Sequence, residues 1–406
     1  MRRTAAGKTA TRCRNTPEYK IGMNPLKSIG KFGQSIWIDY IRRDMLASGE
    51  LKRMIDEDGL SGLTSNPSIF QKAITESDQY DAEIKALAAQ GVKNALDVFE
   101  ALALDDIRMA ADVLRAVYER SEGRDGFVSI EVSPVLAYDA ARTVAEARQL
   151  FKSIDRDNVM IKVPATREGI AAIEQLTAEG INVNATLLFA IPRYEQVAAA
   201  YVSGLEKLAA SRTSARKSKW GGLLSGVASV ASFFVSRIDT KVDKLLAERA
   251  ETAHSEQERA VIGALQGTAA IACSKIAYLK GTKIFSSTRF KALESLGARP
   301  QRLLWASTST KNPKYRDVLY VEELIGPDTV NTIPPATYEA FRDHGKPRAS
   351  LRKNVLDASK VLDSLARLHI DLSEVTRQLE DEGVKAFADS FGAMIHGISE
   401  KAKAVT

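Results

Sequence analysis

The stretch Val159-Met-Ile-Lys-Val-Pro164 places a single charged residue, Lys162, inside a short apolar run. Such a run is typical of a buried strand. Side chains of a strand alternate between two faces, so Lys162 shares its face with Met160 and Pro164, while the opposite face is entirely aliphatic. Burial of an unpaired charge costs several kcal/mol even after the protein relaxes. A lysine at this position therefore needs a structural or a chemical reason.

Three other segments repeat this alternation between a hydrophobic face and a polar face. In a barrel, one face of each strand points inward and the other points toward the surrounding helices. We therefore expect the polar faces to meet inside a barrel, near the C-terminal strand ends where such barrels carry their active sites. The polar faces carry Asp39 in Ser35–Ile41, Glu131 in Phe127–Val132, and Asn184 with Thr186 in Ile181–Phe189.

A buried ion pair between Lys162 and Glu131 is the structural alternative to a catalytic site. Buried ion pairs usually add little net stability, and apolar replacements often serve as well. The convergence of several charged residues and asparagines on one interior therefore favours a functional site.

Short apolar segments alternate with longer helical patterns along most of the chain. Strands separated by helices indicate parallel βαβ units, and eight such strands fit one closed (β/α)8 barrel, the TIM barrel of the α/β class. An open doubly wound sheet is the competing fold, but no glycine-rich dinucleotide fingerprint follows any of these segments. The predicted strands are Ser35–Ile41, Gly62–Asn66, Phe127–Val132, Val159–Pro164, Ile181–Phe189, Val227–Val235, Arg302–Ser309 and Asn331–Pro334.

Helical patterns that end before a glycine fill intervals between the strands, for example Arg42–Asp58 and Arg167–Glu179. Additional helix is predicted at Glu248–Lys280, between the sixth and seventh strands. The C-terminal segment Ala358–Lys403 is predicted to be helical throughout and to pack on the barrel.

The net charge of +6 is concentrated at the N-terminus. Residues 1–31 carry eight basic side chains and one acidic side chain, a charge of +7, so the remaining chain carries −1. A transit peptide, a nucleic-acid-binding arm and a disordered extension are the three interpretations of residues 1–22, and their composition favours the extension. We expect one barrel domain over residues 23–406, with a basic, flexible insertion near 211–226.

Residue types argue against several classes of protein. No apolar run approaches the roughly 18 residues that a membrane helix needs. The two cysteines, Cys13 and Cys273, match no metal-ligand spacing and indicate a reduced, cytoplasmic setting. None of the four histidines falls in a predicted strand, which argues against a histidine triad or a histidine-ligated metal. We therefore expect neither a metal nor a cofactor.

A lysine served by two carboxyl groups is the constellation that remains. A free lysine amine has a pKa of about 10.4 and is a poor nucleophile at neutral pH. Desolvation favours the neutral amine, which attacks a carbonyl to form an imine. The protonated imine then acts as an electron sink when a carbon–carbon bond breaks, and Asp39 and Glu131 divide the proton transfers.

Three motifs carry a specific resemblance through their order and spacing. They are Gly62-Leu-Thr-Ser-Asn-Pro-Ser68, Val159-Met-Ile-Lys-Val-Pro-Ala-Thr166 with Glu168-Gly169, and Ile181-Asn-Val-Asn-Ala-Thr-Leu-Leu-Phe189. Together they resemble the transaldolase family of class I Schiff-base aldolases, from about Asn24 to near the C-terminus. Trp305-Ala-Ser-Thr-Ser-Thr-Lys-Asn312 is similar to the longer bacterial and plant-like branch.

The resemblance implies a role for each matching residue. Lys162 is implied to form the Schiff base, and Asp39 to act as acid and base in carbon–carbon cleavage. Glu131 is implied to act through a water during imine formation and hydrolysis, with Thr186 holding that water. The implied substrate-binding residues are Asn66 and Asn184 for hydroxyl groups, Ser232 and Arg237 for phosphate, and Phe234 for the shape of the site.

Ser309 and Lys311 lie beyond the core of the seventh predicted strand, where a barrel of this type commonly binds phosphate. The shorter transaldolases have an arginine at the position of Lys311. Lysine keeps the charge but loses the planar fork that grips two oxygens, so we expect a weaker or differently arranged phosphate contact.

By resemblance, the chain is expected to transfer a dihydroxyacetone unit from sedoheptulose 7-phosphate to glyceraldehyde 3-phosphate in the non-oxidative pentose phosphate pathway. Its partners are then sugar phosphates. An aldolase that releases free dihydroxyacetone, similar to fructose-6-phosphate aldolase, is the alternative within the class. A nucleic-acid-binding protein acting through its basic tail is the alternative of another class. The near-neutral barrel disfavours it, and we expect neither a nucleic-acid nor a membrane partner. The sequence leaves the oligomeric state open, a homodimer included.

Overall fold

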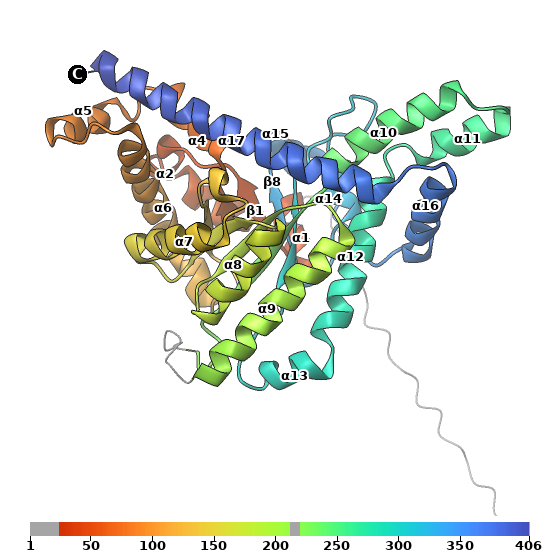
Figure 1. The fold of residues 1–406 in the computed structure, drawn as a ribbon, viewed down its shortest axis with the longest axis horizontal. Helices are drawn as coiled ribbons and strands as arrows, with labels where there is room; N and C mark the ends of the chain where they lie inside the picture. Colours follow the sequence, from red (N-terminus) through yellow and green to blue (C-terminus); the bar gives the residue numbers. More distant parts are fainter. Residues whose placement is uncertain (1–23, 212–219, 406) are drawn as a thin grey trace, which may run out of the picture.

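The computed structural model describes residues 24–211 and 220–405, and it confirms the predicted (β/α)8 barrel with additional helices (Figure 1). Eight parallel strands pair in chain order, and the first closes on the eighth. Their bounds are β1 Gln34–Asp39, β2 Leu60–Thr64, β3 Phe127–Glu131, β4 Val159–Pro164, β5 Val183–Leu188, β6 Ser229–Phe234, β7 Arg302–Ala306 and β8 Thr329–Ile333.

Helices surround the barrel, and the longest of them, α17, runs across one end of it (Figure 1). This helix packs against α4, α5, α6 and α10. The helices are α1 Pro25–Ile29, α2 Arg43–Ala47, α3 Glu50–Arg53, α4 Pro67–Thr75, α5 Asp81–Ala89, α6 Ala95–Arg120, α7 Ala140–Ile154, α8 Arg167–Ala178, α9 Ile191–Ser211, α10 Ser236–Glu251, α11 Glu256–Leu265, α12 Ala269–Phe285, α13 Thr288–Glu294, α14 Leu319–Glu323, α15 Pro335–His344, α16 Val355–Arg367 and α17 Leu372–Val405.

Two predicted helices are wrong in their continuity. The segment Arg42–Asp58 divides into α2, α3 and a π-helical turn, because Gly49 adopts a left-handed conformation with φ of 84°. The segment Ala358–Lys403 divides into α16 and α17, with His369 at a φ of 58° between them. The region Glu248–Lys280 contains the end of α10, all of α11 and the start of α12.

Two other predictions concern segments that lie wholly or partly outside the described residues. Residues 1–22, the predicted N-terminal extension, lie outside the described residues, as do residues 212–219 of the predicted insertion. Within the described ranges, no single helix is long and apolar enough to cross a membrane. The helices α11 and α12 meet that criterion only as a pair bent by 55°.

The inward face of the barrel follows the strand alternation read from the sequence. Trp37 of β1 is buried inside the barrel toward its N-terminal end. A Cβ added to Gly62 of β2 would lie 2.5 Å from the Trp37 ring. Gly62 is therefore the residue that allows the indole to pack between these two strands.

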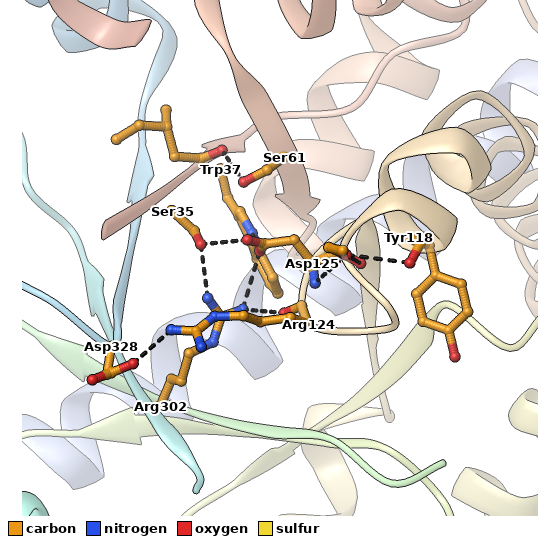
Figure 2. Close-up of polar contacts among 10 residues, drawn as sticks. Ser35, Trp37, Ser61, Tyr118, Arg124, Asp125, Arg302 and Asp328 are labelled. Carbon is orange, nitrogen blue, oxygen red and sulfur yellow. Dashed lines mark hydrogen bonds and ion pairs between the residues drawn. The ribbon is translucent and has the colours of Figure 1, made fainter. Parts of the chain in front are cut away.

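A polar network closes the N-terminal end of the barrel below Trp37 (Figure 2). Asp125 accepts hydrogen bonds from the Trp37 indole at 3.0 Å, from Ser35 and from the Arg302 guanidinium at 3.0 Å. Arg302 also donates to Ser35 and to the carbonyl of Arg124, each at 2.7 Å. The network joins β1, β7 and the loop before β3, so it ties early and late strands together.

We predict that Asp125→Ala lowers the free energy of unfolding by about 3 kcal/mol, because it leaves the Arg302 guanidinium, whose side chain is 8% exposed, without its carboxylate. The matched control is Asp328→Asn, because Asp328 has a φ of 59°, which asparagine tolerates better than alanine does. Asp328 is 63% exposed and pairs with Arg124 at the edge of the same network (Figure 2), so loss of its charge should cost less than about 1 kcal/mol. Urea denaturation of both variants measures the difference. Equal losses would contradict this account.

Candidate active site

Lys162 projects into the barrel from the middle of β4 and is only 4% exposed. Its Nζ donates a hydrogen bond to the carbonyl of Ser65 at 2.8 Å and lies 3.3 Å from Oε2 of Glu131. Glu131 and Lys162 are register partners on adjacent strands, so the parallel pairing of β3 and β4 sets this contact. The amine is thus held at a buried position by one carboxylate and one carbonyl.

Glu131 is buried beside Lys162, and its carboxyl oxygens form no hydrogen bond with the described protein residues beyond this ion pair. Burial raises the pKa of the Glu131 carboxyl, an effect that the charge of Lys162 opposes. A cavity of about 20 Å³ adjoins it and is also lined by Ser65 and Asn66. That volume holds about one water molecule.

Asp39 ends β1 at the same barrel mouth. Its Oδ1 accepts a hydrogen bond from Oγ1 of Thr64 at 2.7 Å. Burial raises the pKa of the Asp39 carboxyl, while Lys162, Thr64 and Arg237 act in the opposite direction. Asp39 therefore holds a proton more readily than an exposed aspartate, as an acid and base working near neutral pH requires.

A cavity of about 230 Å³ opens at the C-terminal ends of the strands and collects most of the predicted site residues. Its volume suits a small polar substrate, and its lining comes from α17 and from seven of the strands or the segments that follow them. The predicted residues that line it are Asp39, Asn66, Lys162, Thr186, Ser232, Phe234, Arg237, Ser309 and Lys311.

Asn184 and Glu131 do not line this cavity. The amide of Asn184 donates to Ser129 at 3.1 Å and accepts from Ser232 at 2.7 Å, and the side chain is fully buried. Asn184 is the register partner of Lys162, and its amide is bonded to Ser129 and Ser232 rather than exposed to the cavity. Its contacts in the structure are those of a residue that holds Ser232.

Thr186 and Asn66 both retain hydrogen-bonding capacity toward the cavity. Thr186 Oγ1 is buried and has no hydrogen-bond partner among the described residues. Asn66 caps α4, where its side-chain oxygen accepts from the backbone N–H of Ile69 at 3.1 Å, which leaves its amide N–H groups for a ligand.

Two cations, Arg237 and Lys311, line the cavity close enough for their charges to interact. Arg237 lies in the first turn of α10, with its guanidinium 5.2 Å from the centre of the Phe234 ring. Lys311, on the loop after β7, donates to Ser309 at 2.8 Å. Neither cation forms an ion pair with a carboxylate of the described residues. Burial lowers the pKa values of both Arg237 and Lys311, and the charge of Arg237 lowers that of Lys311 further. An anion bound between them would relieve this repulsion.

Sequence reasoning missed three residues that shape the site. Thr64 and Thr332 share a 2.7 Å hydrogen bond beside Asp39, and both lie at inward positions that the strand alternation could have identified. Phe387 of α17 also lines the cavity, with its ring centre 5.9 Å from Nζ of Lys162. No local pattern marks Phe387, because its place depends on how α17 crosses the barrel.

Within residues 24–211 and 220–405, no group of three or more His, Cys, Asp and Glu side chains could hold a metal ion.

Comparisons with known proteins confirm the resemblance. The family model described as transaldolase/fructose-6-phosphate aldolase matches residues 36–398. The transaldolase of Thiobacillus denitrificans is 47% identical over 376 residues, which cover 92% of this chain and 99% of the relative. The transaldolase of Trichodesmium erythraeum is 44% identical over 385 residues, covering 94% and 99%, and transaldolase 2 of a Nostoc species is 45% identical over 386 residues, also covering 94% and 99%. The chain therefore belongs to the transaldolase/fructose-6-phosphate aldolase family.

Proposed function

We propose that this protein is a transaldolase, which transfers a dihydroxyacetone unit from sedoheptulose 7-phosphate to glyceraldehyde 3-phosphate through a Schiff base on Lys162. The observation that carries the proposal is one buried lysine that contacts Glu131 and lines the same cavity as Asp39. The names of the relatives support transaldolase over the aldolase that releases free dihydroxyacetone.

Imine formation is the first stage. The neutral Lys162 amine attacks the ketone carbonyl of the donor sugar, and the resulting carbinolamine loses water to give the protonated imine. Glu131 supplies and accepts the protons of this step through a water, for which the adjoining cavity of about 20 Å³ has room. The unpartnered hydroxyl of Thr186 gives a second hydrogen-bonding group for water in the larger cavity.

Carbon–carbon cleavage is the second stage. Asp39 removes the proton from the hydroxyl on the fourth carbon, and the bond between the third and fourth carbons breaks. Its electron pair passes into the imine to form an enamine, and the aldose leaves. Attack of the enamine on the acceptor aldehyde reverses these steps, with Asp39 returning the proton. Hydrolysis of the new imine releases the product ketose and restores the amine.

Substrate orientation follows from the charges around the cavity. Arg237 and Lys311 bind the terminal phosphate with Ser309 and Ser232, while Asn66 binds sugar hydroxyls. Phe234 and Phe387 restrict the remaining space, so water has limited access to the enamine.

Borohydride reduction in the presence of a ketose phosphate should add the mass of one reduced three-carbon unit to the peptide that contains Lys162. Lys162→Met should abolish the adduct. Lys275→Met is the matched control, because Lys275 is also buried but lies away from the cavity. Mass spectrometry of the digested protein measures the adduct. An adduct on any other lysine would refute the mechanism.

The same preparation separates the two activities of the family. A transaldolase consumes donor only when an acceptor aldehyde is present, whereas an aldolase releases dihydroxyacetone at a comparable rate without acceptor. Turnover without acceptor as fast as turnover with it would overturn the transaldolase assignment.

Asp39→Ala should lower kcat by about 10²- to 10⁴-fold, the usual contribution of a general acid or base, because no group remains to move the hydroxyl proton. Imine formation should continue, so borohydride should now trap the intact donor sugar on Lys162. Two measurements on the variant test this role: turnover, which should stop, and borohydride trapping on Lys162, which should continue. Asp39→Asn, whose side chain fills the same space, should behave in the same way. Full turnover in either variant would exclude it.

Activity should fall on acidification with an apparent pKa above the ordinary carboxyl range of about 3.9 to 4.3. Burial raises the pKa values of both Asp39 and Glu131, so these groups bind protons at a higher pH than exposed carboxyls do, and each proton removes a base. The acidic side of the pH profile of kcat/KM measures this apparent pKa. The value belongs to the coupled pair of Asp39 and Glu131 rather than to either residue alone. An acidic limb at or below pH 4 would contradict the prediction.

A further inference from the structure

The loop after β7 carries Lys311 toward Arg237 even though the two cations repel each other. No carboxylate among the described residues forms an ion pair with either of them. A flexible lysine on an exposed loop would relieve the repulsion by turning into solvent. Among the residues that the structure describes, Lys311 itself bonds only to Ser309 of the same loop, so its place depends on the contacts that hold the loop to the rest of the protein.

The base of the loop is fixed by the start of α10. The backbone N–H of Ser236 donates to the carbonyl of Ser307 at 3.0 Å, and the hydroxyls of these two serines are 2.9 Å apart. Thr308 donates to Asn331 of β8 at 3.1 Å. These contacts fix the chain before Lys311 but not after it.

The far side of the loop is fixed by Tyr315, again to α10. Its hydroxyl donates to Oδ2 of Asp243 at 2.7 Å, and Oδ1 of Asp243 accepts from the backbone N–H of Gly267 at 2.9 Å. The ring lies directly on Gly267, where a Cβ would come within 2.8 Å of it, and the φ of this glycine is 70°. One carboxylate thus joins three segments at one point.

A second contact of the same kind lies one helical turn away. Tyr320 donates to Asp239 at 2.8 Å, and Asp239 accepts from the backbone N–H of Ala270 at 2.7 Å. Asp239 and Asp243 therefore project from one face of α10, the helix whose first turn carries Arg237. The same rigid element places one cation directly and the other through the loop.

We propose that Asp243 and Tyr315 are positioning residues of the phosphate site, whose hydrogen bond keeps Lys311 beside Arg237 against their mutual repulsion. This inference rests on the proposed function, in which these two cations bind the substrate phosphate. Neither positioning residue lines the cavity. Their effect is exerted through the loop between Ser309 and Tyr315.

Tyr315→Phe tests the inference because it removes the hydroxyl and keeps the ring. We expect KM for glyceraldehyde 3-phosphate to rise about tenfold, as for loss of one hydrogen bond to a charged group. The inhibition constant of inorganic phosphate should rise by a similar factor. Neither kcat nor KM for unphosphorylated glyceraldehyde should change by more than about twofold, since the Lys162 side of the cavity is untouched.

The matched control is Tyr338→Phe. Tyr338 donates to Asp58 at 3.1 Å, a buried tyrosine–aspartate contact on the π-helical turn that precedes β2. Its loss should lower the melting temperature and leave the phosphate-dependent constants unchanged. Should Tyr315→Phe fail to fold, Asp243→Asn makes the same comparison, because it removes the charge that the tyrosine hydroxyl contacts.

Lys311→Ala separates the two ways in which the inference can fail. A rise in KM for Lys311→Ala without a rise for Tyr315→Phe and Asp243→Asn overturns the positioning role alone. If Lys311→Ala and Arg237→Ala both leave the inhibition by inorganic phosphate unchanged, the phosphate site itself is wrongly placed. A rise in all four variants, absent in Tyr338→Phe, supports both.

Discussion

Burial of the Lys162 ammonium is the constraint on which the rest of the site depends. An interior that excludes bulk water tolerates this charge because Glu131 and the Ser65 carbonyl surround it at 3.3 and 2.8 Å. The parallel register of β3 and β4 makes Glu131 the neighbour of Lys162, and the loop after β2 supplies the carbonyl. The same surroundings raise the pKa values of Glu131 and Asp39. The same arrangement therefore serves stability and chemistry, because the Glu131 carboxyl that pairs with the lysine is also placed to exchange protons with it.

The opposite side of the cavity works by a different electrostatic principle. Arg237 and Lys311 gather positive charge, and no carboxylate of the described residues forms an ion pair with either, so the protein without substrate carries a repulsion that an anion relieves. The lysine lacks the planar fork of an arginine, and its position accordingly depends more on the loop that carries it. In our proposal, the contact of Tyr315 with Asp243 holds that loop in place.

The alternation of strands with helices predicted the barrel, and the alternation of faces within each strand predicted its inward polar residues. The roles of Asn66, Ser232 and Arg237 came from the family resemblance. An inward polar residue within an apolar run is a local signal, and it is enough to identify Lys162, Glu131 and Asp39. The same signal placed Asn184 on the inward face but did not show that its amide bonds to Ser129 and Ser232, because those contacts depend on how neighbouring strands meet in the closed barrel. The division at Gly49 was missed because one glycine is compatible with a continuous helical pattern. Phe387 lies more than two hundred residues from Lys162 in the chain, and its place is a tertiary property.

The position of α17 in the chain has a consequence for biosynthesis. All eight strands, and every charged group of the candidate site, leave the ribosome before this helix does. A nascent barrel can close its sheet and bring Asp39, Glu131 and Lys162 together, yet the side that Phe387 covers stays open to solvent until the last segment emerges. The order of translation thus builds the reactive amine first and its cover last, so the enclosed reaction chamber is completed only near the end of synthesis.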